Sequence, residues 1–555
     1  MKWLERIRYT YSFLGKFADY RKWLKIWETG RLAKQDRERI AGFYAPSRKS
    51  PRPDKTVLFA SFLPLPYVLK MEGLFSRILQ LRGWQAVCLH FPGDMMVKKY
   101  HREVFGNQTI SFNSFIPWHK LDKIESLLEG VLNNGYDSIK SFKYSGSFTG
   151  TSALASLSGA DLTGMSDLDG EGRARLNKLM LRSCLYTEAC KNILQQFKPR
   201  FVVAVEKGFV GCSEIFHQSL HQDTEYIQWT GCHEPNSIMM KRYTMQNVRS
   251  HPFSISAKSW VGMINEPWSD DYRNDVMREF EDGYCGNKWF QYKKLTDHTS
   301  MAGRDEIVSK FNLDRTKKIA VIFSPILNDA NLFYGEDLFK SGFKEWLVET
   351  VKEAVKNDHV NWILKLHPAN TYRRANIGYT GEFGEILAIK EVFGNVPEKI
   401  RIMYPADEVN PLAIFHCLDY ALTVRGTIGA EIPCFGKPVL TGGSGRYSGL
   451  GFTEDSSTAD EYLQKIRNIH LLPPLSKAKT QLAIKHAYLF FKVRPAKYDT
   501  FFQDVYEYPQ GHPCSRDISF KCRNFSELSE NPQLQAMVEW MTNSTDEDFL
   551  TPGYL

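Results

Sequence analysis

Short apolar runs and helix-like segments alternate along the first half of the chain. TVLFA, from Thr56, is apolar enough for a buried strand, an amphipathic stretch follows it, and QAVCLHF is apolar again. A strand, a helix and a second strand in this order predict one βαβ unit at the head of a parallel sheet. FKPRFVVAVEKGFVG predicts a further strand, and TEYIQWTGCHEPNSIMMKRY predicts another strand and a loop.

The second half shows the same alternation after a polar, charged stretch. TKKIAVIFSPIL predicts a strand, and FKEWLVETVKEAVKN predicts a helix, because its apolar residues are three and four positions apart. VNWILKLHP and IRIMYP predict two more strands, and NPLAIFHCLDYALTV predicts a helix followed by a strand. Two such α/β domains joined by a linker are typical of cleft enzymes, in which ligands bind at the carboxyl ends of the strands.

The length of 555 residues is too great for a single hydrophobic core. KSPRPDK is a charged, proline-rich break near residue 50. We therefore predict a basic amphipathic arm over residues 1–50, an N-terminal Rossmann-like domain over 51–300, a C-terminal Rossmann-like domain over 301–490, and a closing helix with a loose tail over 491–555.

The first forty residues mix tryptophan, phenylalanine and leucine with 11 Lys or Arg and 5 Asp or Glu. Their apolar runs are too short to span a bilayer. This composition is typical of an interfacial helix that lies on anionic lipid, and equally of a helix packed on its own domain.

Charge and cysteine content narrow the classes of partner. A formal net charge of +8 suits an anionic substrate or an anionic membrane surface, and it does not by itself indicate nucleic acid, which we do not expect as a partner. The ten cysteines are scattered without a CxxC pair. We therefore expect buried free thiols in a reducing cytosol, and no zinc site.

The stretch VRGTIGAEIPCFGKPV predicts an anion site after a strand. A helix that starts at Thr427 or Ile428 would present free backbone N–H groups and the positive end of its dipole. Gly426 allows close approach, Thr427 adds a hydroxyl and Arg425 adds a fixed charge, which together suit a phosphate. Glu431, one turn further on, could accept hydrogen bonds from ribose hydroxyls. The alternative is a capped helix with a solvated glutamate.

A second anion site is predicted in LKLHPAN. The alternation of a strand places Lys365 and His367 on one face, and Pro368 ends the strand directly after them. Both side chains could reach an anion, although a single histidine can also be structural. The glycine-rich stretch GSGRYSGLGF, with Arg446 and Tyr447, could close over a ligand or form a plain turn.

A carboxylate is expected to face these cations from the other domain. Glu206, at the predicted strand tip in VVAVEKG, is the first candidate, and His233 and Glu234 in GCHEPN are the second. Asp161 and Asp167 in a Gly/Ser-rich loop are further candidates, and Glu206 could also be an exposed strand-end residue. No DxD-type metal motif stands out, so we predict that the chain needs no metal.

KLHP, followed about sixty residues later by DYALTVRGTIGAEIPCFGKPVLTGGSGRYSGLGF, resembles the capsular polysaccharide biosynthesis family of bacterial GT-B glycosyltransferases, which includes Kdo transferases. The resemblance is strongest over residues 316–470. It implies an α/β GT-B fold of two Rossmann-like domains facing each other across a cleft, with the nucleotide held by the C-terminal one. It also implies that His367 contacts the donor phosphate and that Gly426, Thr427, Gly429 and Glu431 belong to the nucleotide site.

The predicted function is transfer of a sugar from a nucleotide-activated donor to a growing capsule or other surface polysaccharide, whose acceptor is a glycan or a lipid-linked glycan. CMP-Kdo is one candidate donor, no cofactor is expected, and the predicted location is the cytoplasm, peripheral at the inner membrane. Lys365, His367 and Arg425 would stabilise the departing phosphate. A carboxylate would deprotonate the acceptor or attack the anomeric carbon. The alternatives are a nucleotide-sugar 2-epimerase, a polyol-phosphate polymerase, or a non-catalytic GT-B protein that binds glycan.

Overall fold

The computed structural model describes residue 38 and residues 55–553, apart from 64, 159–169, 287, 290–300, 330–331, 377–378, 408, 507–515 and 523–524. The predicted arm therefore lies almost wholly outside the described residues, and so do Asp161 and Asp167.

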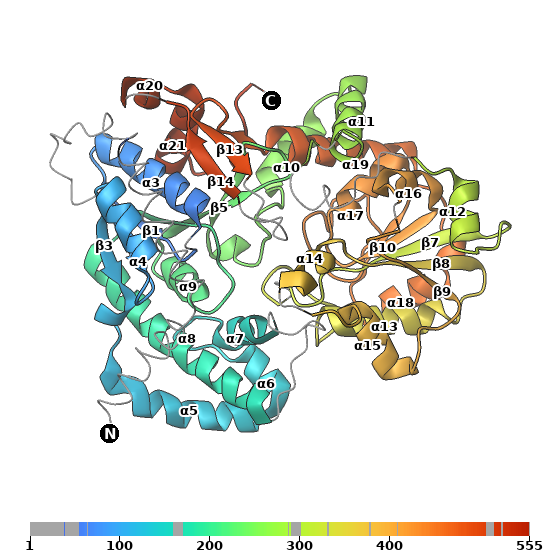
Figure 1. Cartoon of the computed structure of the whole chain (residues 1–555), viewed down its shortest axis with the longest axis horizontal. Helices are drawn as coiled ribbons and strands as arrows, with labels where there is room; N and C mark the ends of the chain where they lie inside the picture. The colour runs from blue at the N-terminus through green and yellow to red at the C-terminus, as the bar shows by residue number, and fades with distance from the viewer. Residues whose placement is uncertain are drawn as a thin grey trace.

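The N-terminal domain is built on a seven-stranded sheet with the order β12-β6-β5-β4-β1-β2-β3 (Figure 1). Five strands are parallel, namely β1 (Thr56–Ala60), β2 (Gln85–His90), β3 (Gln108–Ser111), β4 (Phe201–Ala204) and β5 (Glu225–Gly231). The sheet is closed on one side by two antiparallel strands, β6 (Ser237–Tyr243) and β12 (Ala496–Lys497). The sequence predicted one strand and a loop where the structure has β5 and β6.

Both faces of this sheet are covered. Val57 and Phe59 of β1 belong to one hydrophobic core and Leu58 and Ala60 to another, because successive side chains of a strand point to opposite faces. The first core is covered by α3 (Pro66–Leu81) with α4 (Met95–Lys99), and the second by α5 (Leu121–Asn133), α6 (Gly135–Ser141), α7 (Thr149–Ser158), α8 (Gly170–Phe197) and α9 (Ser213–His221). Burial on both faces explains the continuous apolar run of TVLFA.

The C-terminal domain has a five-stranded parallel sheet with the order β11-β10-β7-β8-β9. Its strands are β7 (Lys318–Phe323), β8 (Val360–Lys365), β9 (Ile400–Met403), β10 (Tyr420–Thr423) and β11 (Val439–Thr441). Its helices are α12 (Arg304–Lys310), α13 (Phe343–Ala354), α14 (Ala369–Asn376), α15 (Gly384–Phe393), α16 (Pro411–Cys417), α17 (Ile428–Glu431), α18 (Ala459–Arg467) and α19 (Lys477–Tyr488). Each predicted strand of this half is present, which confirms the prediction of a second α/β domain.

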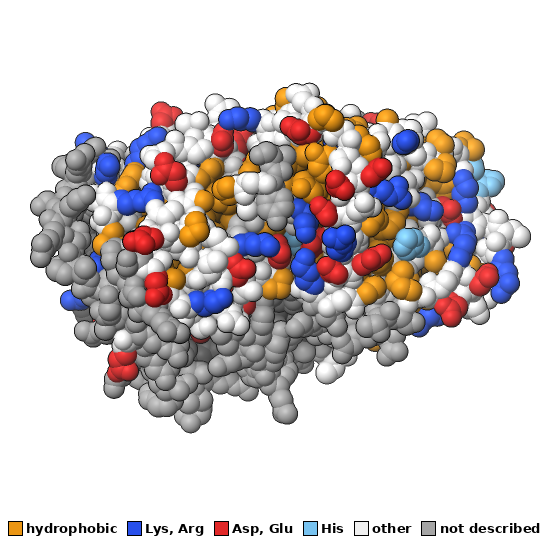
Figure 2. Space-filling model, turned by 90° about the horizontal axis from the view of Figure 1, so that it is seen from above, with side chains coloured by type: hydrophobic (Ala, Val, Ile, Leu, Met, Phe, Trp, Pro, Cys, Tyr) orange, Lys and Arg blue, Asp and Glu red, His pale blue; other side chains and the backbone are white. Residues whose placement is uncertain are grey.

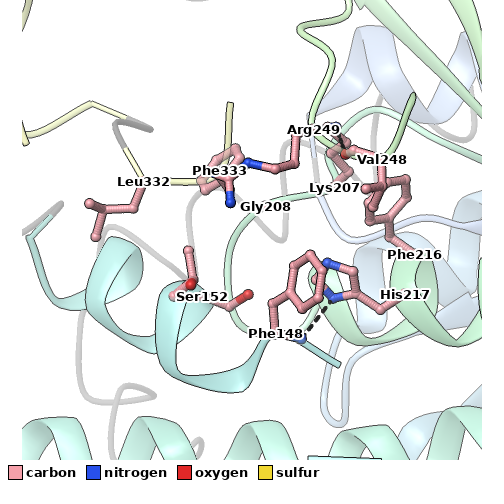
Figure 3. A pocket seen from close by; sticks show the side chains of 11 residues that line it. Phe148, Ser152, Lys207, Gly208, Phe216, His217, Val248, Arg249, Leu332 and Phe333 are labelled. Atoms are coloured by element: carbon pink, nitrogen blue, oxygen red, sulfur yellow. Dashed lines mark hydrogen bonds between the residues drawn. The ribbon is translucent and has the colours of Figure 1, made fainter. Parts of the chain in front are cut away.

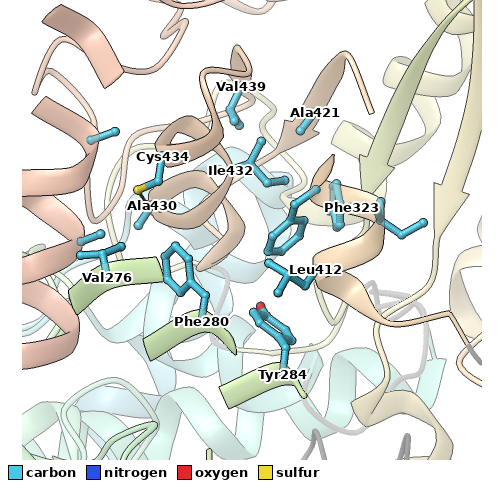
Figure 4. Packing of buried hydrophobic residues seen from close by; sticks show 14 of the residues in the cluster. Val276, Phe280, Tyr284, Phe323, Leu412, Ala421, Ala430, Ile432, Cys434 and Val439 are labelled. Carbon is cyan, nitrogen blue, oxygen red and sulfur yellow. Dashed lines mark hydrogen bonds between the residues drawn. The ribbon is translucent and has the colours of Figure 1, made fainter. Parts of the chain in front are cut away.

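The chain passes between the domains more than once. Helices α10 (Ala257–Asn265) and α11 (Asp270–Tyr284) follow the N-terminal sheet in sequence, yet the core of the C-terminal domain includes Phe280 and Tyr284 of α11 (Figure 4). After α19 the chain returns through β12, the hairpin of β13 (Phe502–Tyr506) and β14 (Arg516–Phe520), α20 (Phe525–Ser529) and α21 (Pro532–Asn543). Met537 and Val538 of α21 are buried in the first core of the N-terminal domain. The prediction of a loose tail is therefore wrong for the described part of this segment.

A mainly parallel sheet and a wholly parallel sheet, each with helices on both faces, confirm the predicted α/β fold of two Rossmann-like domains. No described helix combines the length and the apolar character that a membrane span requires. The face in Figure 2 mixes acidic, basic and hydrophobic side chains, so the net charge of +8 does not gather into one basic patch on that face. The nine cysteines in the described ranges are free thiols.

Candidate functional site

Each sheet has one point where the order of its strands reverses direction. In the C-terminal sheet the chain runs outward from β7 to β8 and β9 and then resumes on the other side of β7 with β10 and β11. In the N-terminal sheet the same reversal separates β1 from β4. Ligands of open α/β sheets bind at the carboxyl ends of the strands at such a switch point. The loop after β10 carries Arg425, Gly426 and Thr427, and the loop after β4 carries Glu206, so both predicted groups lie at a switch point.

The carboxyl ends of the two sheets face each other across a contact between loops. The ring of Phe333, in the loop after β7, packs so closely on Gly208, after β4, that a Cβ atom on Gly208 would lie 2.0 Å from it. Phe333 also meets Phe209 edge to face, with 5.3 Å between ring centroids. The structure therefore places Glu206 in the loop that meets the C-terminal domain, as the sequence predicted.

Lys365 ends β8, and His367 follows two residues later. Strands β8 and β10 flank β7, so their tips are roughly 10 Å apart, a distance that a nucleotide phosphate and ribose can bridge. Burial lowers the pKa of Lys365 to about 8, although the carboxylate of Asp407 opposes the shift. Nδ1 of His367 accepts the N–H of Ala369 at 3.2 Å, so the neutral ring carries its proton on Nε2, where it can be donated to an anion.

Glu385 of α15 holds this loop in place. Its side chain is buried, and its Oε1 accepts from the side-chain amide of Asn370 at 2.6 Å and from the backbone N–H of His367 at 3.4 Å. Burial raises the pKa of Glu385 to about 7 despite these hydrogen bonds. The sequence did not single out Glu385, because a glutamate in an amphipathic helix is ordinarily solvated.

The helix expected after Gly426 begins at Ile428, one of the two predicted starts, and is short. Helix α17 spans only Ile428–Glu431 and continues as a 3₁₀ turn, Ile432–Phe435. Pro433 has no backbone N–H and cannot extend an α-helical ladder. One turn carries little of a helix macrodipole, so the helix dipole would contribute little to anion binding at this position. Gly426 and Thr427 remain partly exposed at the tip of β10, and their predicted contact with a phosphate stays a prediction.

Arg425 already has anionic and carbonyl partners within the protein. Its guanidinium forms an ion pair with Asp337 and donates to the carbonyl of Tyr334, both in the loop after β7. Burial raises the pKa of Asp337, although Arg425 opposes this. A phosphate that binds Arg425 would compete with Asp337, a partner that no local sequence pattern predicts.

Glu431 and Gly429 have structural roles that differ from those predicted. The side chain of Glu431 is 1% exposed, and its carboxylate accepts the hydroxyl proton of Tyr284, which α11 brings against this segment (Figure 4). This burial contradicts the prediction that Glu431 binds ribose. Gly429 lies against Tyr447, whose hydroxyl oxygen would be 2.0 Å from a Cβ atom at that position. Gly429 therefore makes room for a tyrosine.

Glu206 is held at the tip of β4 by its own loop. Its Oε1 accepts the backbone N–H groups of Lys207 at 2.7 Å and Gly208 at 3.0 Å. Burial raises the pKa of the Glu206 carboxyl, and the charge of Asp329, from the loop after β7, adds to that shift. A carboxyl group with a raised pKa, opposed by a second carboxylate from the facing domain, suits proton transfer. Asp329 was not recognised from the sequence.

His233 and Glu234 are engaged in the packing between the β5–β6 turn and α11. The ring of His233 lies among Trp289, Phe490 and Phe491, and its Nε2 is 3.2 Å from the carbonyl oxygen of Phe491. Glu234 lies 3.5 Å from the ammonium of Lys497 and 3.9 Å from that of Lys288. These contacts explain both residues structurally, so their predicted catalytic role gains no support from the geometry.

A small cavity of about 20 Å³ lies where Lys207, His217 and Phe333 converge (Figure 3). It has room for about one water molecule. Lys207 is buried, and its ammonium donates to the carbonyls of Val248 at 2.6 Å and Ser250 at 3.0 Å. Burial lowers the pKa of Lys207 well below its usual value. The cavity is too small for a nucleotide, so we assign Lys207 to the packing beneath the site.

No protein-family model and no curated protein sequence matches this chain. Similar solved structures include the UDP-GlcNAc 2-epimerase from Neisseria meningitidis bound to UDP-GlcNAc, at 12% identity and a TM-score of 0.25, covering 79% of this chain and 97% of that one. Two Thermosulfurimonas dismutans KpsC structures are also similar. The β-Kdo 2,4 transferase is 10% identical with a TM-score of 0.32, and the match covers 60% of this chain and 87% of that one. The β-Kdo 2,7 transferase is 12% identical with a TM-score of 0.30, and the match covers 61% of this chain and 88% of that one.

The identities of these structures to this chain reach only 12%, and their TM-scores lie below 0.5, so the fold is assigned from the strand order of the two sheets. Within the described ranges, no group of three or more His, Cys, Asp or Glu residues is placed to hold a metal ion. Metal independence itself stays a prediction.

Proposed function

We propose that this chain is a GT-B glycosyltransferase that moves a sugar from a nucleotide-activated donor to a surface polysaccharide. The observation that supports it most directly is the placement of Glu206 and Arg425 at the switch points of two facing sheets, with Lys365 and His367 at the nearby tip of β8. A donor phosphate would lie at the C-terminal switch point, with its sugar directed toward the loop after β4.

Each group would have one role in the reaction. Lys365 and the Nε2–H of His367 would stabilise the negative charge that develops on the phosphate as the glycosidic bond breaks. Glu206, with its raised pKa, would accept the proton of the acceptor hydroxyl as the new bond forms. Glu206 could instead attack the anomeric carbon, and the stereochemistry of the product would separate the two routes.

The finer parts of the proposal concern the substrate and the location. CMP-Kdo is one candidate donor, and a capsule glycan or a lipid-linked glycan is the proposed acceptor. The arm over residues 1–50 is proposed to bind the anionic inner face of the membrane. Co-sedimentation with anionic vesicles should be reduced for a chain that begins at Thr56, and equal sedimentation of both chains would exclude the arm as an anchor.

The experiment that tests the proposal is turnover of a panel of CMP-, UDP- and GDP-sugars, with and without glycan acceptors. We expect His367→Ala to reduce kcat by about 100-fold, as for removal of one transition-state hydrogen-bond donor. His359→Ala is the matched control, because His359 lies just before the amino end of β8, whereas the candidate site lies at the carboxyl end of that strand. Unchanged turnover in His367→Ala would exclude this site. A 2-epimerase would convert its donor without an acceptor, so product analysis separates that alternative.

A further inference from the structure

The loop after β11 brings a second arginine, Arg446, to the same edge of the sheet as Arg425. A Cβ atom on Gly445 would lie 2.7 Å from Cβ of Arg425, so the two chain segments are in direct contact. Tyr447, the next residue, donates its hydroxyl proton to the carbonyl of Gly426 at 2.8 Å. Arg446 therefore adjoins the β10 tip on the side of β11.

Arg446 is partly buried, and two nitrogen atoms of its side chain are shielded from solvent without acceptors. Its Nε and Nη1 atoms are buried and have no hydrogen-bond partner, and no carboxylate pairs with it in the described part of the chain. The ring of Phe253 lies 5.2 Å away. Burial lowers the pKa of Arg446 to about 10. Buried donors without acceptors and buried charges without counter-ions both destabilise a fold, so this arrangement needs an explanation.

Other buried arginines of this protein show the contrast. Arg494 is fully buried, but it lies 3.1 Å from the carboxylate of Asp548 and donates to three backbone carbonyls, those of Ser254, Met240 and Pro252. Arg425 is paired with Asp337. Within the described ranges, Arg446 pairs with no carboxylate and its side chain donates to no backbone carbonyl.

Among the residues that the structure describes, the polar side chain that reaches Arg446 is His251, and it cannot fully serve as its acceptor. Nε2 of His251 lies 3.3 Å from Nη2 of Arg446, while Nδ1 of His251 is 3.1 Å from the backbone N–H of Phe253. Burial keeps His251 neutral by lowering its pKa well below the usual value. A neutral imidazole has one acceptor nitrogen, so it can accept from Phe253 or from Arg446 but not from both.

We propose that Arg446 binds an oxyanion of the substrate, either a phosphate of the nucleotide or a carboxylate of an acidic sugar. This inference rests on the proposed function, because it assigns the ligand to the same switch point. A guanidinium presents a planar fork of N–H donors that fits two oxygens of either group. To admit them, the loop must move away from the segment after β7, to which Ser444 is bound by hydrogen bonds of 2.7 and 2.8 Å with Glu336.

The test is calorimetry and thermal unfolding of the full chain with Arg446→Gln, Arg446→Lys and the control Arg467→Gln. Arg467 lies on the surface and pairs with Glu353. The probes are CMP, UDP, UDP-glucose, UDP-glucuronate, CMP-sialate and inorganic pyrophosphate. We expect Arg446→Gln to weaken binding at least tenfold without lowering the unfolding temperature of the ligand-free protein, and Arg446→Lys to retain part of the affinity.

The pattern of the loss identifies the oxyanion. An equal loss for UDP, UDP-glucose and UDP-glucuronate assigns the phosphate, whereas a loss confined to UDP-glucuronate and CMP-sialate assigns the carboxylate. Equal binding by the wild type and Arg446→Gln, or a lowered unfolding temperature of the ligand-free variant, would overturn the inference and leave the proposed function standing. If pyrophosphate alone stabilises the protein through Arg446, the anion site stands and the proposed function fails. If no probe binds, both fail.

Discussion

Asp548 joins the C-terminal segment to the N-terminal domain through buried charges. Its Oδ1 lies 2.9 Å from the ammonium of Lys241 on β6 and 3.1 Å from the guanidinium of Arg494, and its Oδ2 accepts the backbone N–H of Ser256 at 2.7 Å. The side chains of Asp548 and Arg494 are 0% exposed and that of Lys241 is 1% exposed. Arg494 therefore pairs with this carboxylate, and Lys241 shares it with the partly exposed Glu547, whose carboxylate lies 3.5 Å from the ammonium.

Replacing Asp548 by asparagine keeps the shape of the side chain and removes its charge. Breaking a buried ion pair by removing one partner costs about 3–5 kcal/mol, since the other charge stays buried without compensation. We expect Asp548→Asn to lower the free energy of unfolding by about that amount, because Arg494 loses its carboxylate partner while Lys241 keeps the partly exposed Glu547.

The measurement is urea unfolding followed by circular dichroism, with Asp546→Asn as the matched control. Asp546 lies two residues away and pairs with Lys258, but their side chains are 45% and 80% exposed. Exposed ion pairs contribute about 0–1 kcal/mol, so the control should unfold almost like the wild type. A loss in Asp548→Asn no larger than that of the control would refute the argument from burial.

The same carboxylate predicts how stability depends on pH. Burial alone would raise the pKa of Asp548, but Arg494 and Lys241 outweigh it and hold the pKa well below the usual range. The unfolded chain has an aspartate pKa of about 3.9, so the contribution of Asp548 is complete above about pH 5 and is lost as the pH falls below about 4. The acid side of the stability curve should be flatter in Asp548→Asn than in the wild type.

Three further predictions concern the candidate site. In Gly429→Ala the new methyl group would clash with the buried Tyr447 hydroxyl, so the free energy of unfolding should fall by about 1–3 kcal/mol. Urea titrations would measure this fall, and an unchanged midpoint would contradict the packing described. Nucleotide affinity measured by calorimetry should fall between pH 7 and 9 as Lys365 loses its proton near pH 8, and Lys365→Arg should abolish this dependence because a guanidinium stays charged. Asp337→Asn should lower the free energy of unfolding by about 3 kcal/mol, because it removes the carboxylate that pairs with the buried Arg425. It should also raise nucleotide affinity about tenfold, because a phosphate would no longer compete with Asp337 for Arg425. A parallel loss of affinity would show that Asp337 supports the site.

The sequence predicted the strands well because most of them are buried on both faces. Runs such as TVLFA and KIAVIF are apolar throughout, so their extent is visible without tertiary information. The position of Lys365 and His367 followed from the same strand pattern and from Pro368. Local rules of this kind locate strand tips, and in open α/β folds strand tips locate candidate sites.

The partners of those side chains could not be predicted, because they come from distant parts of the chain. Tyr284, whose hydroxyl donates to the buried Glu431, lies 147 positions before it in the sequence. Asp337, which pairs with Arg425, lies 88 positions before that arginine. Strand β12 has only two residues, so no alternation of apolar and polar positions could have identified it in the sequence. The return of the C-terminal segment to the first sheet was missed for that reason.

The internal pairing of the candidate anion site has a consequence for its chemistry. Arg425 would exchange Asp337 for a phosphate, so the net gain from this arginine in the bound state is small, while Lys365, with a pKa near 8, is mostly protonated at pH 7 and a bound phosphate would complete its protonation. In the proposed reaction the phosphate becomes more negative as the sugar leaves, so each of these cations would bind the transition state better than the donor. Interactions that strengthen only as charge develops raise kcat, whereas uniform binding lowers KM alone. A site whose cations are paired or partly neutral at rest is therefore better suited to catalysis than to tight storage of a nucleotide.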